Sequence, residues 1–202
     1  MKRVPKGEWG YIKSEKKWRL IITVSLFILP VLAFVLGLII AGTTANILSV
    51  IAMVGMLPGC RAIVALVMML PRQPLSEADY NIIKAHENDE LVVGYELYLT
   101  AYEKSALMEA FAICGNRLVG LMRDPKADLR YETEHLSKMI RANVCAPDVK
   151  LYNDINVFTK AMDSMSSHPE AHREGVRYQV NEDHPELELE DLIYQTLLSI
   201  SL

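Results

Sequence analysis

Apolar residues are concentrated in two long spans near the start of the chain. Residues 20–41 hold no charged side chain, and residues 46–70 hold only one, Arg61. At 1.5 Å of rise per residue, the first span reaches about 33 Å as a helix, which is enough to cross the ~30 Å hydrocarbon layer of a bilayer. The two spans therefore predict two transmembrane helices, and the short link at 42–46 makes them an antiparallel hairpin.

The charges before the first span predict its orientation. Residues 1–19 carry seven Lys and Arg against two Glu, and Lys and Arg beside a span stay on the cytoplasmic side. We therefore place both termini in the cytoplasm and the hairpin in the cell inner (plasma) membrane. An alternative makes the first span a cleaved signal peptide, because small residues follow it at 41–45. The length of this span, and the second span directly after it, favour the hairpin.

Three residues of the hairpin are candidates for packing or for contact with a partner. Gly55 and Gly59 form a G-x-x-x-G, which lets helix backbones approach closely, either within the hairpin or in self-association between copies of the chain. Arg61 lies nine residues before the end of the second span, and a charge at that depth costs a few kcal/mol. We expect it to snorkel, to bond carbonyls freed by Pro58 or to pair with a partner, with an ion pathway as the alternative.

Beyond the hairpin the periodicity changes to that of a mixed α/β (α+β) domain. Residues 91–100 alternate between apolar and polar, which predicts a strand with Leu91, Val93, Tyr95, Leu97 and Leu99 on one face. The other expected elements are a helix at 76–88 capped by Ser76, strands at 106–114 and 117–122 joined by a Gly115-Asn116 turn, a helix at 124–143 capped by Asp124, a strand at 149–152 and a helix capped by Asp154. This order is α-β-β-β-α-β-α, followed by a C-terminal helix.

The pattern divides the chain into five segments. They are a basic cytosolic segment at 1–19, the transmembrane hairpin at 20–70, the cytosolic α/β domain at 75–165, an acidic linker at 166–185 and a C-terminal amphipathic helix at 186–202. Apolar residues recur at helical spacing in the last segment. We expect this helix to dock on its own domain, with a groove of a partner protein as the alternative.

The part of the chain after the hairpin is acidic. Residues 73–202 carry 12 Lys and Arg against 23 Asp and Glu, and the whole chain has a net charge of −4. Such a surface repels phosphate backbones, so we expect no nucleic acid partner. The three cysteines lie far apart in the sequence and are expected to be reduced thiols rather than disulfides.

The order α-β-β-β-α-β resembles the core of the restriction-endonuclease-like fold, over residues 76–153. Members of that fold pair an acid near the second strand with a D/E-x-K triplet on the third. Asp124-Pro125-Lys126 matches this triplet, and Glu109 or Glu103 could supply the upstream acid. Against an active nuclease, Pro125 places the triplet at a helix start, and the acidic domain offers no basic groove. The catalytic candidates are therefore Glu109, Asp124 and Lys126.

A second group of candidate residues could bind a metal ion. His168 and His172 stand four residues apart, as zinc ligands do on a helix, but Pro169 occupies the position of the usual catalytic Glu. No third ligand has a defined position, so we expect neither a metal nor a cofactor. The sequence also lacks the motifs of phosphate-binding loops, nucleophilic serines and redox cysteine pairs.

Several phrases of the sequence resemble uncharacterised membrane proteins with two transmembrane helices from gut Firmicutes. They are PKGEWGY at 5–11, AYEKS at 101–105, ICGN at 113–116 and the ending LSISL at 198–202. Some of that group are labelled O-linked N-acetylglucosamine transferase-like, but about 130 residues are too few for the nucleotide-binding framework of such an enzyme.

Taken together, the patterns favour a membrane-anchored, non-enzymatic interaction or regulatory module. Its expected partners are the lipid bilayer, a protein and a second copy of the chain. A divergent enzyme with a nuclease-like fold and a small channel or transporter subunit are the alternatives.

Overall fold

The computed structural model describes residues 3–100, 105–125, 127–178 and 187–201. The chain forms two compact units. The hairpin unit contains residues 3–4 and Ile12–Gln73, and the sheet domain contains Pro5–Tyr11 together with the chain from Pro74 onward. The segment before the first helix is thus shared between the two units.

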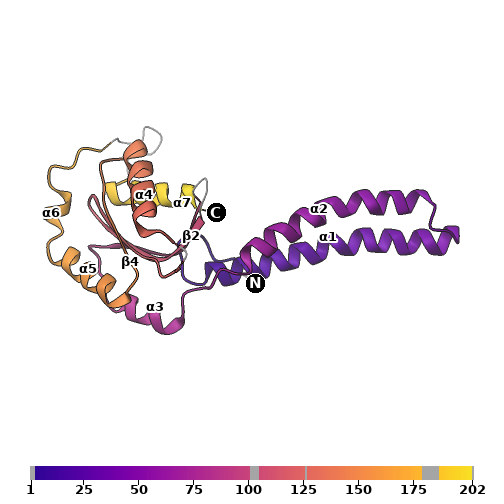
Figure 1. The fold of residues 1–202 in the computed structure, drawn as a ribbon, viewed down its shortest axis with the longest axis horizontal. Helices are drawn as coiled ribbons and strands as arrows, with labels where there is room; N and C mark the ends of the chain where they lie inside the picture. The colour runs from indigo at the N-terminus through magenta and orange to yellow at the C-terminus, as the bar shows by residue number, and fades with distance from the viewer. Residues whose placement is uncertain (1–2, 101–104, 126, 179–186, 202) are drawn as a thin grey trace. The chain divides into compact units, whose positions relative to one another are not determined.

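The hairpin unit consists of two long helices joined by a short turn (Figure 1). Helix α1 spans Tyr11–Ala41 and helix α2 spans Ile47–Met69, with Asn46 as the N-cap of α2 through a bond from the Ser49 N–H. Both helices are long and apolar enough to cross a membrane. Four of the basic residues before the first apolar span belong to α1 as well, because this helix begins nine residues earlier than the span itself.

The two glycines of the G-x-x-x-G face α1. A side chain on Gly59 would place its Cβ 2.7 Å from the ring of Phe27, and one on Gly55 would place it 3.3 Å from Pro30. Small residues at these two positions therefore allow α2 to pack closely on α1.

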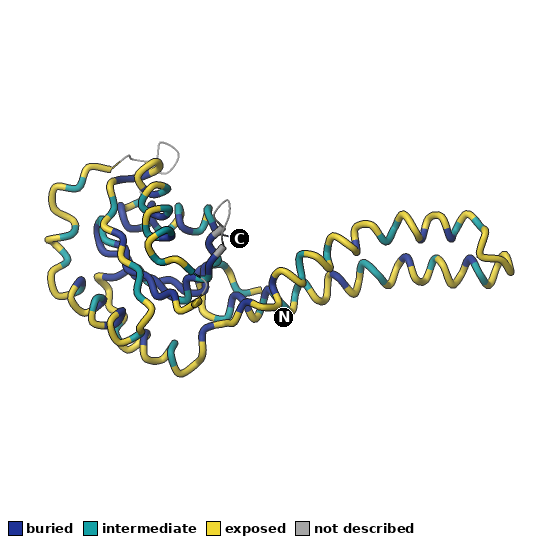
Figure 2. Tube along the Cα trace, viewed as in Figure 1, coloured by how far each residue is buried: buried dark blue, intermediate teal, exposed yellow. Residues whose placement is uncertain are grey.

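The remaining surface of the hairpin is apolar and open. Figure 2 shows most of both helices as exposed. Leu29 and Ile40 in α1 are 73% and 75% exposed, and Ile47 in α2 is 77% exposed. Such a large exposed apolar surface is unusual for a protein domain in water.

The sheet domain is built on one mixed four-stranded sheet in the order β1-β2-β3-β4. The strands are β1 Val92–Thr100, β2 Ser105–Cys114, β3 Arg117–Leu121 and β4 Asp148–Tyr152. The first three pair antiparallel, and β4 pairs parallel to β3. A parallel pair requires a crossover connection, and helix α4 (Leu129–Asn143) provides it.

Helices cover both faces of the sheet (Figure 1). Leu136 and Ile140 of α4 pack on one face together with Leu192 and Ile193 of α7, which spans Leu189–Ile200. The other face packs against α3 (Glu77–Lys84) and α5 (Ile155–Ser167). The short helix α6 (Glu170–Arg173) lies between α5 and α7 in the chain. The apolar stripe of the C-terminal helix therefore docks on its own domain.

Strand β1 changes face halfway along its length, which corrects the expected single apolar face. Leu91 and Tyr95 pack towards α3 and α5, but Leu97 and Leu99 pack towards α4 and α7. Glu96 lies between the two pairs and has φ 53°, the only positive value outside glycine among the described residues. This left-handed residue reverses the alternation, and simple two-residue periodicity cannot reveal it.

The chain segment before α1 forms part of the sheet domain. The Tyr95 N–H donates to the Gly7 carbonyl at 2.8 Å, and Lys6 donates to the Ser201 carbonyl at 2.9 Å. The ring of Trp9 stacks on Tyr80 of α3 with centroids 4.4 Å apart. Isolated bridges from Gly7 and Ser201 thus cover the outer edge of β1 at two points.

Two predicted helix boundaries differ in the structure. Helix α4 begins at Leu129 with Asp128 as its N-cap, whereas Asp124 was the expected cap. Asp128 is preferred because its carboxylate accepts the N–H groups of Arg130 and Tyr131. Helix α3 ends at Lys84, four residues before the expected end.

Candidate functional site

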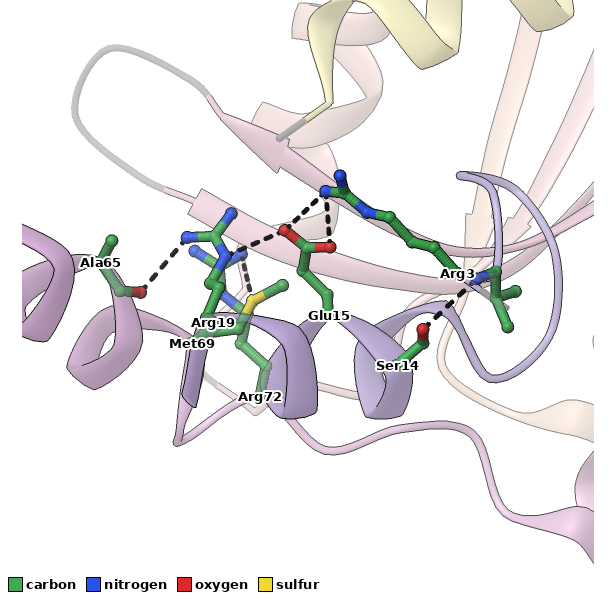
Figure 3. Close-up of polar contacts among 8 residues, drawn as sticks. Arg3, Ser14, Glu15, Arg19, Ala65, Met69 and Arg72 are labelled. Carbon is green, nitrogen blue, oxygen red and sulfur yellow. Dashed lines mark hydrogen bonds and ion pairs between the residues drawn. The ribbon is translucent and has the colours of Figure 1, made fainter. Parts of the chain in front are cut away.

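A buried carboxylate organises one end of the hairpin unit. Glu15 of α1 has a side chain only 6% exposed and forms ion pairs with Arg3 at 2.9 Å and with Arg19 at 3.1 Å (Figure 3). Arg19 lies one turn further along the same helix, and Arg3 comes from the segment before the helix. The anion of Glu15 therefore holds two of the basic residues in fixed positions.

The cations of α1 also bond the end of α2. Lys16 donates to the backbone carbonyl of Leu70 at 2.8 Å and to that of Arg72, and Arg19 donates to the carbonyl of Ala65 at 3.3 Å (Figure 3 shows the Arg19 bond). The last carbonyls of a helix lack intrahelical partners and carry the negative end of the helix dipole. We call the polar set of Arg3, Glu15, Lys16, Arg19 and Arg72 the hairpin base.

The sheet domain carries a second charged cluster on the side of α3. The Arg123 guanidinium lies 2.7 Å from Asp79 of α3, and its Nε donates to Glu109 of β2 at 2.7 Å. Burial raises the pKa of the Asp79 carboxyl, but the hydrogen bonds from Arg123 and Ser76 outweigh it and leave that pKa below its usual value. Glu109 and Asp79 in turn raise the pKa of Arg123.

Two acidic residues face each other across the first two strands at this point. The register passes from Tyr95↔Ala110 to Leu97↔Met108, which leaves Glu96 opposite Glu109. Glu96 is fully buried, and its carboxylate accepts the Leu75 N–H at 3.0 Å. Glu109, by contrast, forms an ion pair with Arg123. The guanidinium occupies the space between the Glu109 and Asp79 carboxylates.

A third cluster fastens the C-terminal part of the domain. Arg173 of α6 donates to Glu190 of α7 at 2.7 Å and to Glu90 at 2.6 Å. Glu190 also accepts the N–H of Gly115 in the turn between β2 and β3 at 3.0 Å. Burial raises the pKa of Glu190, but the bonds from Arg173 and Gly115 outweigh it and leave that pKa below its usual value.

The nuclease candidates of the sequence do not assemble as a triplet. Glu109 enters the cluster with Arg123 and Asp79, whereas Asp124 lies in the segment after β3 and its backbone carbonyl accepts the Ala127 N–H. Lys126 and Glu103 lie outside the described residues. The partner of Glu109 is Arg123, the residue directly before the predicted triplet at 124–126.

The two candidate metal-binding histidines lie around α6. His168 is the C-cap of α5, and the carbonyl of His172 accepts the Asn116 N–H at 3.0 Å. Burial, followed by the charge of Arg117, lowers the pKa of His172. Within the part of the chain that the structure describes, no three His, Cys, Asp or Glu side chains gather as metal ligands.

The remaining candidates lie on α2. Gly55 and Gly59 pack within the hairpin, as described above, while Arg61 is exposed on the outer side of the helix. Cys60 is also exposed, whereas Cys114 and Cys145 are buried free thiols whose pKa values burial raises.

Sequence reasoning missed most of the charged contacts. Asp79 was visible only as an acid in the first turn of a helix, and Arg123 only as the residue after a strand. The pairs join residues 44 and 14 positions apart, so local spacing carries no signal for them. The register of β2 and β3 sets Ala110 opposite Leu121, so it brings Glu109 near the end of β3 but does not by itself pair it with Arg123.

Comparison of the chain with family models, curated proteins and solved structures gives no match. The resemblance to membrane proteins with two transmembrane helices therefore stays a prediction.

The Arg173→Gln variant tests whether Arg173 compensates the buried charge of Glu190. We expect a loss of about 1–3 kcal/mol in the free energy of unfolding at pH 7, since a buried charged acceptor loses its cation. In the native protein the lowered pKa of Glu190 contributes stability above pH 4.5, and this contribution is lost as the pH falls below that value. In the variant the cation is gone, so the pKa of Glu190 lies higher than in the native protein and the difference in stability between the two proteins shrinks towards pH 4.

Urea unfolding of the full chain in mild detergent between pH 4 and pH 8, followed by tryptophan fluorescence, measures this difference. Arg130→Gln, which breaks the exposed pair with Glu134, is the matched control and should change little. A difference between native protein and Arg173→Gln that is independent of pH would contradict the assignment.

Proposed function

We propose that this chain is a membrane-anchored, non-enzymatic interaction module. In this proposal the hairpin spans the bilayer, both termini lie in the cytoplasm, and the sheet domain binds a protein there. The distribution of charge along the hairpin unit carries the anchoring part of the proposal. Apart from Arg61, the charged side chains between residues 12 and 73 lie at 13–19 and at Arg72.

The hairpin base supports the placement of both ends of the hairpin on one side of the membrane. Lys16 and Arg19 of α1 bond the carbonyls of Leu70 and Ala65 in α2, so the charged ends of both helices lie together. The opposite end is the turn at 42–46, which carries no charge. A hairpin with charge at one end and open apolar surface elsewhere suits insertion from the basic side.

The binding part of the proposal is supported by the edge of the sheet at β4. The α7 stripe and the Gly55/Gly59 face pack within the chain, and Gly7 and Ser201 cover the edge of β1. In the described part of the chain, β4 pairs only with β3. An open strand edge accepts an extended segment of a partner by main-chain hydrogen bonds.

Cysteine labelling tests the membrane topology. The variant Thr44→Cys reports on the turn and Glu134→Cys on the exposed side of α4, both in a chain with Cys60→Ser. We expect an impermeant maleimide to label Thr44→Cys in right-side-out membrane vesicles and Glu134→Cys only in inverted vesicles. Labelling of both positions from one side, or release of the chain from the membrane by alkaline carbonate, would contradict the anchor.

Photocrosslinking tests the partner surface. A photoreactive phenylalanine analogue replaces Lys150, which is exposed on β4, and in a control variant it replaces Lys138, which is exposed on α4. We expect a discrete crosslinked protein from position 150 and none from position 138, because Lys150 lies on the strand whose edge is open and Lys138 lies on a helix. A chain that remains a monomer in mild detergent, with no crosslink at position 150, would argue strongly against a binding module.

An enzyme with a restriction-endonuclease-like fold is the second candidate. The order α3-β1-β2-β3-α4-β4 and the position of Glu109 on the second strand favour it. On this hypothesis Asp79 and Glu109 serve a divalent cation that displaces Arg123, because carboxylates are the preferred ligands of Mg²⁺.

Metal-dependent cleavage of DNA or RNA by the purified chain tests this candidate. An active nuclease should lose activity by about a hundredfold or more in both Glu109→Gln and Asp79→Asn. Glu134→Gln, an exposed acid of α4, is the control and should retain activity. Cleavage that persists in Glu109→Gln would exclude this cluster as the active site.

A further inference from the structure

We infer that one face of α1 binds anionic phospholipid, with Lys13 and Lys17 holding the acidic headgroup. The inference rests on the proposed membrane anchor and goes further, because it names the lipid class and the residues. Lys13 and Lys17 stand one helical turn apart and are both exposed. Their ammonium groups therefore lie on the same side of α1.

The cations of α1 that belong to the hairpin base, and Arg3 before the helix, are already occupied. Glu15 pairs with Arg3 and Arg19, and Lys16 bonds two backbone carbonyls. Lys13 and Lys17 make no ion pair or hydrogen bond within residues 3–100 or the other described ranges. These two lysines are thus the cations of α1 that can accept a phosphate without breaking an internal contact.

The same face of α1 continues as an apolar surface. At 100° per residue, Leu20, Val24 and Val31 lie within about 40° of Lys13 around the helix axis. They are 51%, 50% and 46% exposed. The face therefore carries two cations at one end and open apolar side chains along the rest, which matches a phospholipid with its phosphate at one end and its acyl chains below.

The depth of the lysines matches the headgroup layer. Lys17 precedes Leu20 by three residues and Lys13 by seven, so their backbones lie about 4.5 and 10 Å from the start of the apolar span. The headgroup layer is roughly 5–8 Å thick on each side of a bilayer. The backbone of Lys17 thus lies within this layer, and that of Lys13 lies just outside it, within reach of the headgroups through its long side chain. Trp18 is half-buried beside them, at the level where tryptophan is enriched in membrane proteins.

The apolar face distinguishes a lipid from a soluble phosphate compound. A free phosphate would contact only the two lysines. Salt strongly screens the attraction between such exposed charges. A lipid phosphate is held at the same level by its acyl chains, and each lysine beside an anionic membrane contributes roughly a fivefold preference. Acidic lipid headgroups are therefore the occupants we infer.

Spin-labelled lipids in vesicles that contain the full chain test the inference. The motionally restricted component of the spectrum gives the relative association of labelled phosphatidylglycerol and labelled phosphatidylcholine with the protein. We expect a preference of about fivefold or more for phosphatidylglycerol in the native chain, falling close to one in the double variant Lys13→Gln/Lys17→Gln. Inorganic phosphate at millimolar concentration should leave the preference unchanged.

The control variant Lys138→Gln/Lys160→Gln removes the same charge from exposed positions of α4 and α5. It should keep the preference of the native chain. Equal association of the two lipids with the native chain, or a preference that survives Lys13→Gln/Lys17→Gln, would overturn this inference alone. A spectrum with no restricted component at all would overturn the membrane anchor together with it.

Discussion

The hydrogen bonds from α1 to the carbonyls at the end of α2 are the interaction on which the hairpin depends. Helix α2 has no basic residue in its own last turn, so its final carbonyls need donors from elsewhere. The N–H groups of Leu70 and Arg72 donate to the carbonyls of Leu66, Val67 and Met69. Lys16 and Arg19 add bonds to the carbonyls of Leu70 and Ala65, and Glu15 fixes the position of Arg19. Cations near a helix C-terminus also interact favourably with its dipole. The basic segment thus bonds the end of the second helix in addition to forming the start of the first.

The basic residues of α1 fall into two groups, those with internal contacts and those without. Residues that bond carbonyls or Glu15 lie in fixed internal positions, whereas Lys13 and Lys17 face outward above the exposed apolar surface of α1. The internal contacts and the outward face lie on different sides of the same helix. A single basic segment can therefore support the anchor and still present cations to the surroundings.

Much of the sheet domain could be predicted from the sequence, because caps, turns and apolar periodicity mark its strands and helices locally. Ser76 and Asp154 cap the helices for which they were predicted to do so, and the Gly115-Asn116 turn joins β2 to β3 as predicted. The prediction of Asp124 as the cap of α4 was wrong, because Asp128, four residues later, makes the capping bonds. Two equivalent cap residues in one loop cannot be ranked without the position of the helix.

The cluster of Arg123, Glu109 and Asp79 could not be predicted from the sequence, for a different reason. Glu96 adopts a left-handed conformation, so the face of β1 changes where sequence alternation continues unbroken. The register leaves Glu96 opposite Glu109, and Glu109 forms its ion pair with Arg123, which follows β3. A residue with unfavourable φ is held in place only if its surroundings stabilise it, so the buried carboxylate of Glu96 and the ion pair of Glu109 belong to one structural unit.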